Sequence, residues 1–173
     1  MLAGAGDEYR NLHKLLVQLA GREELCRRWC EIPGVGPVTA VTFLSAVDDP
    51  RRFAKSKTLG AHFGLTPKRE QSGTSVDYDG HISRRGDREV RCALYEAASA
   101  MLTRSKTHST LKAWGMKLAG KRGHKRAVVA VARKLATIMH RMWIDGSRFR
   151  FSAKDETSGE QHGGGSTVAL ASA

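Results

Sequence analysis

The chain has 173 residues, which suffice for one domain with a hydrophobic core and exclude two large ones. Its 29 lysines and arginines outnumber the 17 aspartates and glutamates, and the resulting net charge of +12 favours a polyanionic partner. No stretch approaches the ~20 apolar residues of a membrane span, and the first residues lack a signal-peptide pattern, so we expect a cytoplasmic protein with no membrane partner.

The first predicted element is a helix from Asp7 to about Cys30. Its apolar residues follow a three-to-four spacing with a weak interruption at Gly21, which is typical of an amphipathic docking arm. Cys26 and Cys30 share one face of this helix and are interpreted as small buried apolar residues. No Cys-x-x-Cys pair or histidine pair completes a zinc set, so we expect no metal site in this chain.

A glycine turn, Ile32-Pro-Gly-Val-Gly-Pro37, separates this helix from a short apolar helix that ends near Val47. Two glycines one residue apart allow close backbone approach, and their amides point outward beside the positive end of the next helix. That geometry holds a phosphate oxygen without reading a base. The residues predicted to contact DNA here are Gly34, Val35, Gly36 and Thr39. The alternative is a helix–helix turn with no ligand.

Residues 65–83 lose the helical period after a further short helix at 55–63, and we interpret them as an irregular hairpin. Ser72, on a Gln-Ser-Gly turn, is a candidate nucleophile toward a backbone phosphate. The side chains predicted to neutralise that phosphate are Lys68, Arg69, Arg84, Arg85 and Arg88. Tyr78 is a competing nucleophile, and Asp77 and His81 are candidates to orient a group or accept a proton. The alternative for Ser72 is a purely structural Ser-Gly turn, and the alternative for the other three is a polar loop residue without a chemical role.

Three basic helices are predicted at 87–103, 109–119 and 125–144. Residues 104–150 carry thirteen lysines and arginines against one acid, Asp145, whereas residues 1–50 carry five against seven acids. This one-sided clustering favours nucleic acid over a charge that serves solubility alone. Residues 152–173, rich in serine and glycine, are predicted to be a disordered tail. The fold class is therefore mainly α: a helical bundle with a helix-hairpin-helix motif at 31–47 and a short hairpin insertion.

Several ordered motifs together resemble one family, the insertion-sequence one-ten (116/902) transposases, over about residues 25–150. They are the glycine turn, Leu59-Gly-Ala-His-Phe-Gly-Leu-Thr-Pro67, Gln71-Ser-Gly73, Ile82-Ser-Arg-Arg-Gly-Asp-Arg88 and the run from Ala127 to Leu135. The resemblance implies DNA recombination guided by a structured RNA, with Ser72 linked covalently to DNA, and it favours a homo-oligomer.

The resemblance also implies an N-terminal domain of ribonuclease-H-like fold, whose four carboxylates bind magnesium. The thirty residues before the glycine turn form one predicted helix, and one helix cannot bring four acids together. We therefore expect residues 1–30 to be a connector remnant, the transposase domain to span 31–151, and magnesium to require a missing domain. The predicted protein is truncated and not autonomously active. The main alternative is a non-catalytic helix-hairpin-helix module that binds nucleic acid.

Overall fold

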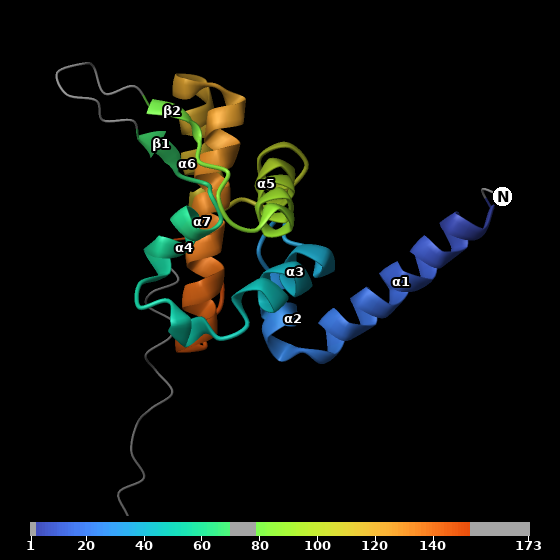
Figure 1. Ribbon diagram of the computed structural model, residues 1–173. Coiled ribbons are helices and arrows are strands. Elements are labelled where there is room, and N and C mark those ends of the chain that lie inside the picture. Colours follow the sequence, from blue (N-terminus) through green and yellow to red (C-terminus); the bar gives the residue numbers. More distant parts are fainter. Residues whose placement is uncertain (1–2, 70–78, 153–173) are drawn as a thin grey trace, which may run out of the picture.

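The computed structural model describes residues 3–69 and 79–152 (Figure 1). This part of the chain forms seven α-helices, two 3-10 helices and one two-stranded antiparallel ribbon, so the predicted mainly-α class is confirmed. The elements are α1 (Ala3–Arg22), α2 (Glu24–Cys30), α3 (Pro37–Val47), η1 (Pro50–Arg52), η2 (Ser56–Thr58), α4 (Leu59–His62), β1 (Pro67–Arg69), β2 (Asp79–Ile82), α5 (Arg88–Thr103), α6 (Thr110–Arg122) and α7 (His124–Asp145).

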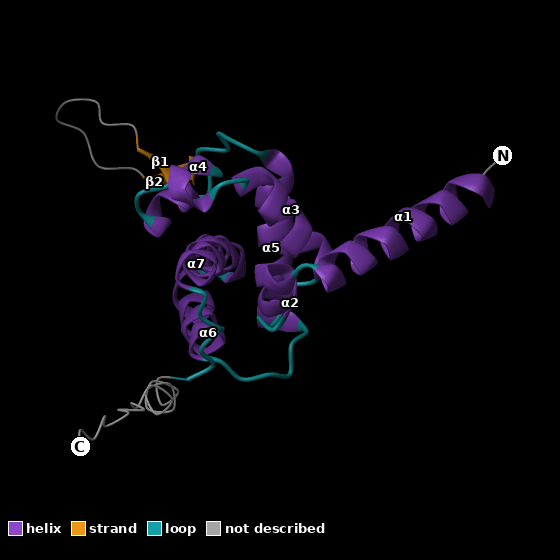
Figure 2. Cartoon of the chain, turned by 90° about the horizontal axis from the view of Figure 1, so that it is seen from below, coloured by secondary structure: helices purple, strands orange, loops and turns teal. Residues whose placement is uncertain are grey.

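Helix α7 is the central element of the fold. α4, α5 and α6 all pack against it, and Figure 2 views it nearly along its axis with these helices around it. Its stripe of Val128, Val131, Leu135 and Met139 is fully buried. An apolar residue every three or four positions places one helix face in the core, so this stripe was predictable from the sequence.

The predicted helix from Asp7 to Cys30 is wrong as a single element, because the chain breaks into α1 and α2 at Glu23. Glu23 has an extended backbone, with φ −80° and ψ 113°, directly after the poor helix former Gly21 and the end of α1 at Arg22. The break turns α2 so that Trp29 enters the core, where its Nε1 donates a hydrogen bond of 2.9 Å to the Met139 carbonyl.

Helix α1 leaves the body and extends away from it (Figures 1 and 2). It contacts α2 and α3 near its end, where Ala20 is buried. Leu12, Leu15 and Leu19 are 66%, 58% and 54% exposed. The amphipathic stripe expected from the sequence is therefore present on a helix that the body does not cover.

A buried histidine fixes the segment that leads to α4. His140 on α7 is fully buried, its Nε2 donates to the Pro50 carbonyl at 2.8 Å, and its Nδ1 lies 2.9 Å from Ser56 Oγ. Because Pro50 belongs to η1 and Ser56 to η2, both 3-10 helices are held against α7. This anchoring sets the position at which α4 and the ribbon begin.

The prediction that both cysteines of the α2 face are buried is confirmed for Cys26, whereas Cys30 is half-buried. Cys26 is fully buried, and burial raises the pKa of its thiol to about 11. Burial also raises the pKa of the Cys30 thiol. Within the described ranges, no helix has the length and apolar character needed to cross a membrane.

Candidate nucleic-acid interface

The two glycines of the turn between α2 and α3 have different structural tasks. Gly34 has φ +88°, and a Cβ added there would lie 2.3 Å from the Ala97 carbonyl oxygen and 2.8 Å from the Met101 amide nitrogen of α5. The turn backbone therefore lies directly on the α5 backbone. Gly36 has φ −109°, and a Cβ there would meet nothing within 4 Å. Only the first glycine is required by packing.

The structure narrows the set of donors that the turn offers. The Val35 amide donates to the Ile32 carbonyl at 3.0 Å, and the Val35 side chain is buried. Thr39 is only 8% exposed. The amides of Gly34 and Gly36 donate to no acceptor among the residues that the structure describes. Val35 is therefore excluded as a donor and Thr39 is nearly covered, and the amides of the two glycines remain the best candidate donors.

A groove of about 550 Å³ lies beside the turn, between the end of α2 and the linker that joins α5 to α6. Arg104 and Lys106 of this linker line it and are exposed. The linker is held in place because Lys112 Nζ donates to the Ser105 carbonyl and the Thr107 amide donates to Ser105 Oγ at 3.2 Å. Two cations thus lie in the same groove as the two glycines.

These linker cations were not predicted from the sequence to belong to the site. In the sequence analysis they were included only in the total charge of residues 104–150. They lie directly after the end of α5. The linker after α5 lies beside the glycine turn only because of the tertiary fold, in which Gly34 packs against Ala97 and Met101 near the end of α5. The sequence alone does not show this proximity. The available signal was the short basic run at 104–108.

The predicted irregular hairpin is an antiparallel ribbon at its base, where Pro67 pairs with Ile82 and Arg69 with Asp79. Ser72, Asp77 and Tyr78 lie outside the described residues. Lys68, Arg69 and His81 have backbones in the two strands, and the structure does not describe their side chains. The ribbon leaves the body near α4 and α7 (Figure 1).

The base of the ribbon is tied by a close crossing of two chain segments. Gly64 and Gly86 have φ +67° and +84°, and a Cβ at Gly86 would lie 1.8 Å from the His62 carbonyl oxygen. Arg91 donates to the carbonyl of Phe63 at 3.1 Å and to that of Arg85 at 3.4 Å. The Arg91 guanidinium therefore holds the two chain segments together where they cross. We name this crossing the ribbon clamp, and it consists of Gly64, Gly86 and Arg91.

The predicted contact residues fall into two separate groups. Arg84, Arg85 and Arg88 are exposed beside the ribbon clamp, at the start of α5, whereas the glycine turn lies against the second half of α5. A helix rises 1.5 Å per residue, so roughly 18 Å of α5 separates the groups. The three arginines therefore do not share the groove, in which the glycine turn lies beside Arg104 and Lys106 instead.

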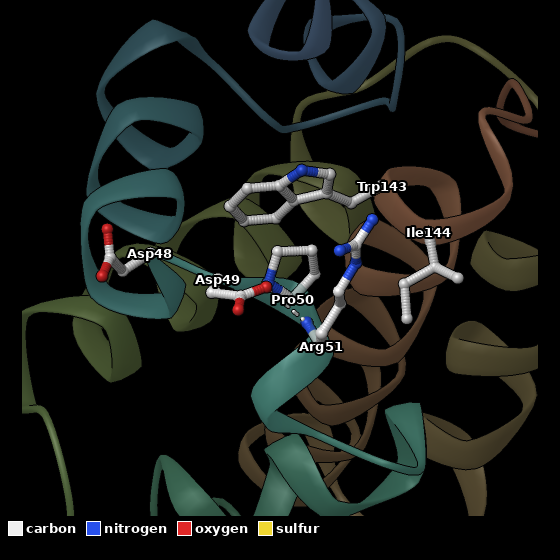
Figure 3. Close-up of a pocket in the computed structure, with 6 residues that line it drawn as sticks. All are labelled: Asp48, Asp49, Pro50, Arg51, Trp143 and Ile144. Carbon is white, nitrogen blue, oxygen red and sulfur yellow. Dashed lines mark hydrogen bonds between the residues drawn. The ribbon is translucent and has the colours of Figure 1, made fainter.

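A second hollow, of about 480 Å³, lies between the end of α3 and the end of α7 (Figure 3). Asp48 and Asp49 line it together with Arg51, and the Asp49 carboxylate accepts a hydrogen bond of 2.8 Å from the Arg51 amide. The two carboxylates oppose a polyanion in this hollow, whereas one carboxylate, Glu31, lines the groove at the glycine turn and lies 3.5 Å from the Arg148 guanidinium. The groove at the glycine turn is therefore the better candidate.

The described ranges contain no group of three or more histidine, cysteine or acidic side chains able to hold a metal ion. The described residues thus do not fit the four-carboxylate magnesium centre that the family resemblance implies. No step of the chemistry below is therefore assigned to a metal on this chain.

These features define a class: a small, strongly basic helical domain with a glycine turn on its core and a ribbon tied beside it. The chain belongs to the transposase IS116/IS110/IS902 family, whose model matches residues 26–114. The resemblance inferred from the motifs is thereby confirmed.

Three relatives illustrate the family. The putative transposase y4pF/y4sB of Sinorhizobium fredii is 34% identical over 154 residues, which cover 84% of this chain and 40% of the relative. The transposase for insertion sequence element IS1111A of Coxiella burnetii is 38% identical over 72% of this chain and 34% of the relative. The pilin gene-inverting protein of Moraxella bovis is 30% identical over 63% and 34%. The chain spans 34–40% of the length of these relatives.

Proposed function

We propose that this domain binds the DNA backbone at the groove beside the glycine turn and acts in DNA transposition. The main supporting observation is that the groove combines the unengaged amides of Gly34 and Gly36 with the cations Arg104 and Lys106. Neutral donors and cations at one place are the chemistry that a phosphate diester takes.

The contact would fix the position of a duplex without reading its sequence. Backbone amides donate to phosphate oxygens in every sequence, and lysine and arginine contribute charge. The turn itself cannot be pushed aside, because Gly34 rests on the backbone of α5. A rigid turn beside two cations on a short linker supports backbone binding.

The alternative of a helix–helix turn whose surroundings are basic for solubility predicts a different salt response. Each phosphate contact releases counterions, so the logarithm of affinity falls with the logarithm of salt concentration by about 0.9 per contact. If the charge only keeps the protein soluble, removing the cations of one site does not change the dependence of DNA affinity on salt more than removing other exposed cations does.

Replacing both linker cations, Arg104→Gln with Lys106→Gln, is expected to weaken duplex DNA binding about tenfold or more at low salt. Exposed ion contacts contribute about 0–1 kcal/mol each and charge-assisted hydrogen bonds about 1.5–3 kcal/mol each, so the loss of two such contacts gives tenfold as a lower estimate. The slope of affinity against salt should become shallower by up to about 0.9 for each phosphate that the variant no longer neutralises. Fluorescence anisotropy with a labelled duplex over a salt series measures both quantities.

The matched control is Lys14→Gln with Arg22→Gln, which removes the same charge from exposed positions on α1. It should leave the salt slope unchanged. Equal losses in the linker variant and in this control would mean that total charge drives binding, and the groove would then not be the site.

We further propose that Ser72 is the nucleophile of the family reaction. Its Oγ would form a bond to a backbone phosphorus while the bond from phosphorus to a deoxyribose oxygen breaks, and the serine proton would pass to that leaving oxygen. The number of phosphodiester-type bonds is unchanged, so no oxidant or energy source is needed. Lys68 and Arg69 are the cations nearest along the chain to support the charged phosphorus, and Arg84 and Arg85 are exposed at the ribbon clamp.

The family resemblance supplies the remaining parts of this proposal. They are a structured RNA guide, a second copy of the chain, and a carboxylate-bearing domain that binds magnesium outside the residues described above. On this proposal the chain binds DNA by itself but does not complete transposition without that domain.

A further inference from the structure

The turn between α6 and α7 carries a second concentration of positive charge. Residues 121–126 read Lys-Arg-Gly-His-Lys-Arg, and all six are exposed. We name them the basic tip. In Figure 1 they lie where α6 meets α7, at the end of α7 farthest from the end of the described chain. We propose that the basic tip is a second contact for the backbone of duplex DNA, in addition to the groove of the proposed function.

Lys121 and Arg122 lie in the last turn of α6, where cations are favoured, but Lys125 and Arg126 serve no visible purpose within the fold. Among the described residues, Lys121, Arg122, Lys125 and Arg126 form no ion pair and no side-chain hydrogen bond. The first turn of α7 contains no acid, and Lys125 and Arg126 stand there at the positive end of the helix dipole. Cations are disfavoured at that end, so their placement works against local stability. An external anion removes the conflict.

The position of the basic tip fits the same duplex that the groove would hold. α6 begins directly after the groove linker and runs for 13 residues to the tip. A helix of that length extends about 20 Å. Along such a distance a duplex presents on the order of ten phosphates. Lys117 is exposed on α6 between the two sites. One duplex lying along α6 therefore reaches both.

The chemistry of the tip favours a duplex over a single strand. Proteins that hold single strands stack the bases on aromatic side chains, and the tip contains no Phe, Tyr or Trp. Four flexible cations on a convex turn provide charge without a stacking surface. Their natural counterpart is a row of backbone phosphates.

The test replaces the four cations together, Lys121→Gln, Arg122→Gln, Lys125→Gln and Arg126→Gln. The inference rests on the proposed function, so the groove variant described above is measured in parallel. We expect the tip variant to bind duplex DNA at least tenfold more weakly, with a salt slope shallower by about 1 for each phosphate that it ceases to bind. Removing Lys125 and Arg126 relieves the conflict with the dipole of α7, and removing Lys121 and Arg122 weakens the end of α6, so the thermal stability should change little.

The control variant removes the same charge from scattered exposed positions: Lys14→Gln, Arg22→Gln, Arg27→Gln and Lys57→Gln. If the tip variant and this control lose affinity equally while the groove variant loses more, the tip inference is wrong and the proposed function stands. If the unaltered protein shows no salt-dependent binding, the proposed function fails first. A loss confined to single-stranded DNA, or to duplex RNA, would also overturn the assignment to duplex DNA.

Discussion

Replacing Gly34 with alanine is expected to lower the free energy of unfolding by about 2–5 kcal/mol. The residue has φ +88°, where an L side chain costs about 1–2 kcal/mol. The added Cβ would also lie 2.3 Å from a backbone oxygen of α5, and such overpacking costs about 1–3 kcal/mol more. Because backbone atoms cannot rotate away, the turn must lift off α5. Urea unfolding followed by circular dichroism measures the change.

Gly36→Ala is the matched control, two residues away in the same turn. Its φ of −109° suits any residue, and its Cβ would enter open space. The only loss is a less favourable helix cap, below about 1 kcal/mol. Equal destabilisation by the two substitutions would contradict the assignment of packing to Gly34. A Gly34→Ala protein that stays folded should also lose DNA affinity, since the turn forms one wall of the groove.

Replacing Ser72 with alanine is expected to abolish covalent attachment of the protein to DNA. The substrate is a duplex whose scissile linkage carries a bridging sulfur, because a thiolate leaves without a proton donor and so reduces the demand on any other domain. The unaltered chain should yield an adduct that survives denaturing electrophoresis. Ser72→Ala should yield none while it retains duplex affinity, because binding is proposed to lie at the groove and tip.

Three neighbouring hydroxyls provide the controls. Thr74→Ala and Ser75→Ala should leave the adduct unchanged, and Tyr78→Phe tests the competing phenol. An adduct that persists in Ser72→Ala and disappears in Tyr78→Phe would transfer the role to tyrosine. A chain that binds DNA but never forms an adduct would favour the non-catalytic binding module.

The core of the fold was predictable because its helices obey a regular period. The α7 stripe and the α5 helix, capped by Asp87 through bonds to the amides of Glu89 and Val90, follow directly from spacing and capping. The break at Glu23 was not, since Gly21 weakens a helix without fixing where it ends. The burial of Trp29 between α2, α3 and α7 decides that break, and burial is a tertiary property.

The candidate site was predictable only in its local parts. The glycine turn consists of consecutive residues and can be recognised as a local sequence motif. The cations that complete the groove belong to a linker some seventy residues later in the chain. For Thr39 the sequence contained a signal of burial, the helical spacing, but the prediction followed the nearby glycine turn instead. Thr39 stands four residues after Val35 and four before Phe43, both buried, so the helical period already assigned it to the core. The structure places it there, at 8% exposure.

The ribbon clamp has a consequence for how this lineage can change. The segments that lead into β1 and out of β2 cross at the ribbon clamp. The geometry of this crossing depends on Gly64, on Gly86 and on the carbonyl groups to which Arg91 donates hydrogen bonds, and none of these interactions involves residues 70–78. Changes of sequence between the strands therefore leave the interactions of the ribbon clamp in place. New reactivity can be acquired there by mutation while the remainder of the domain folds as before.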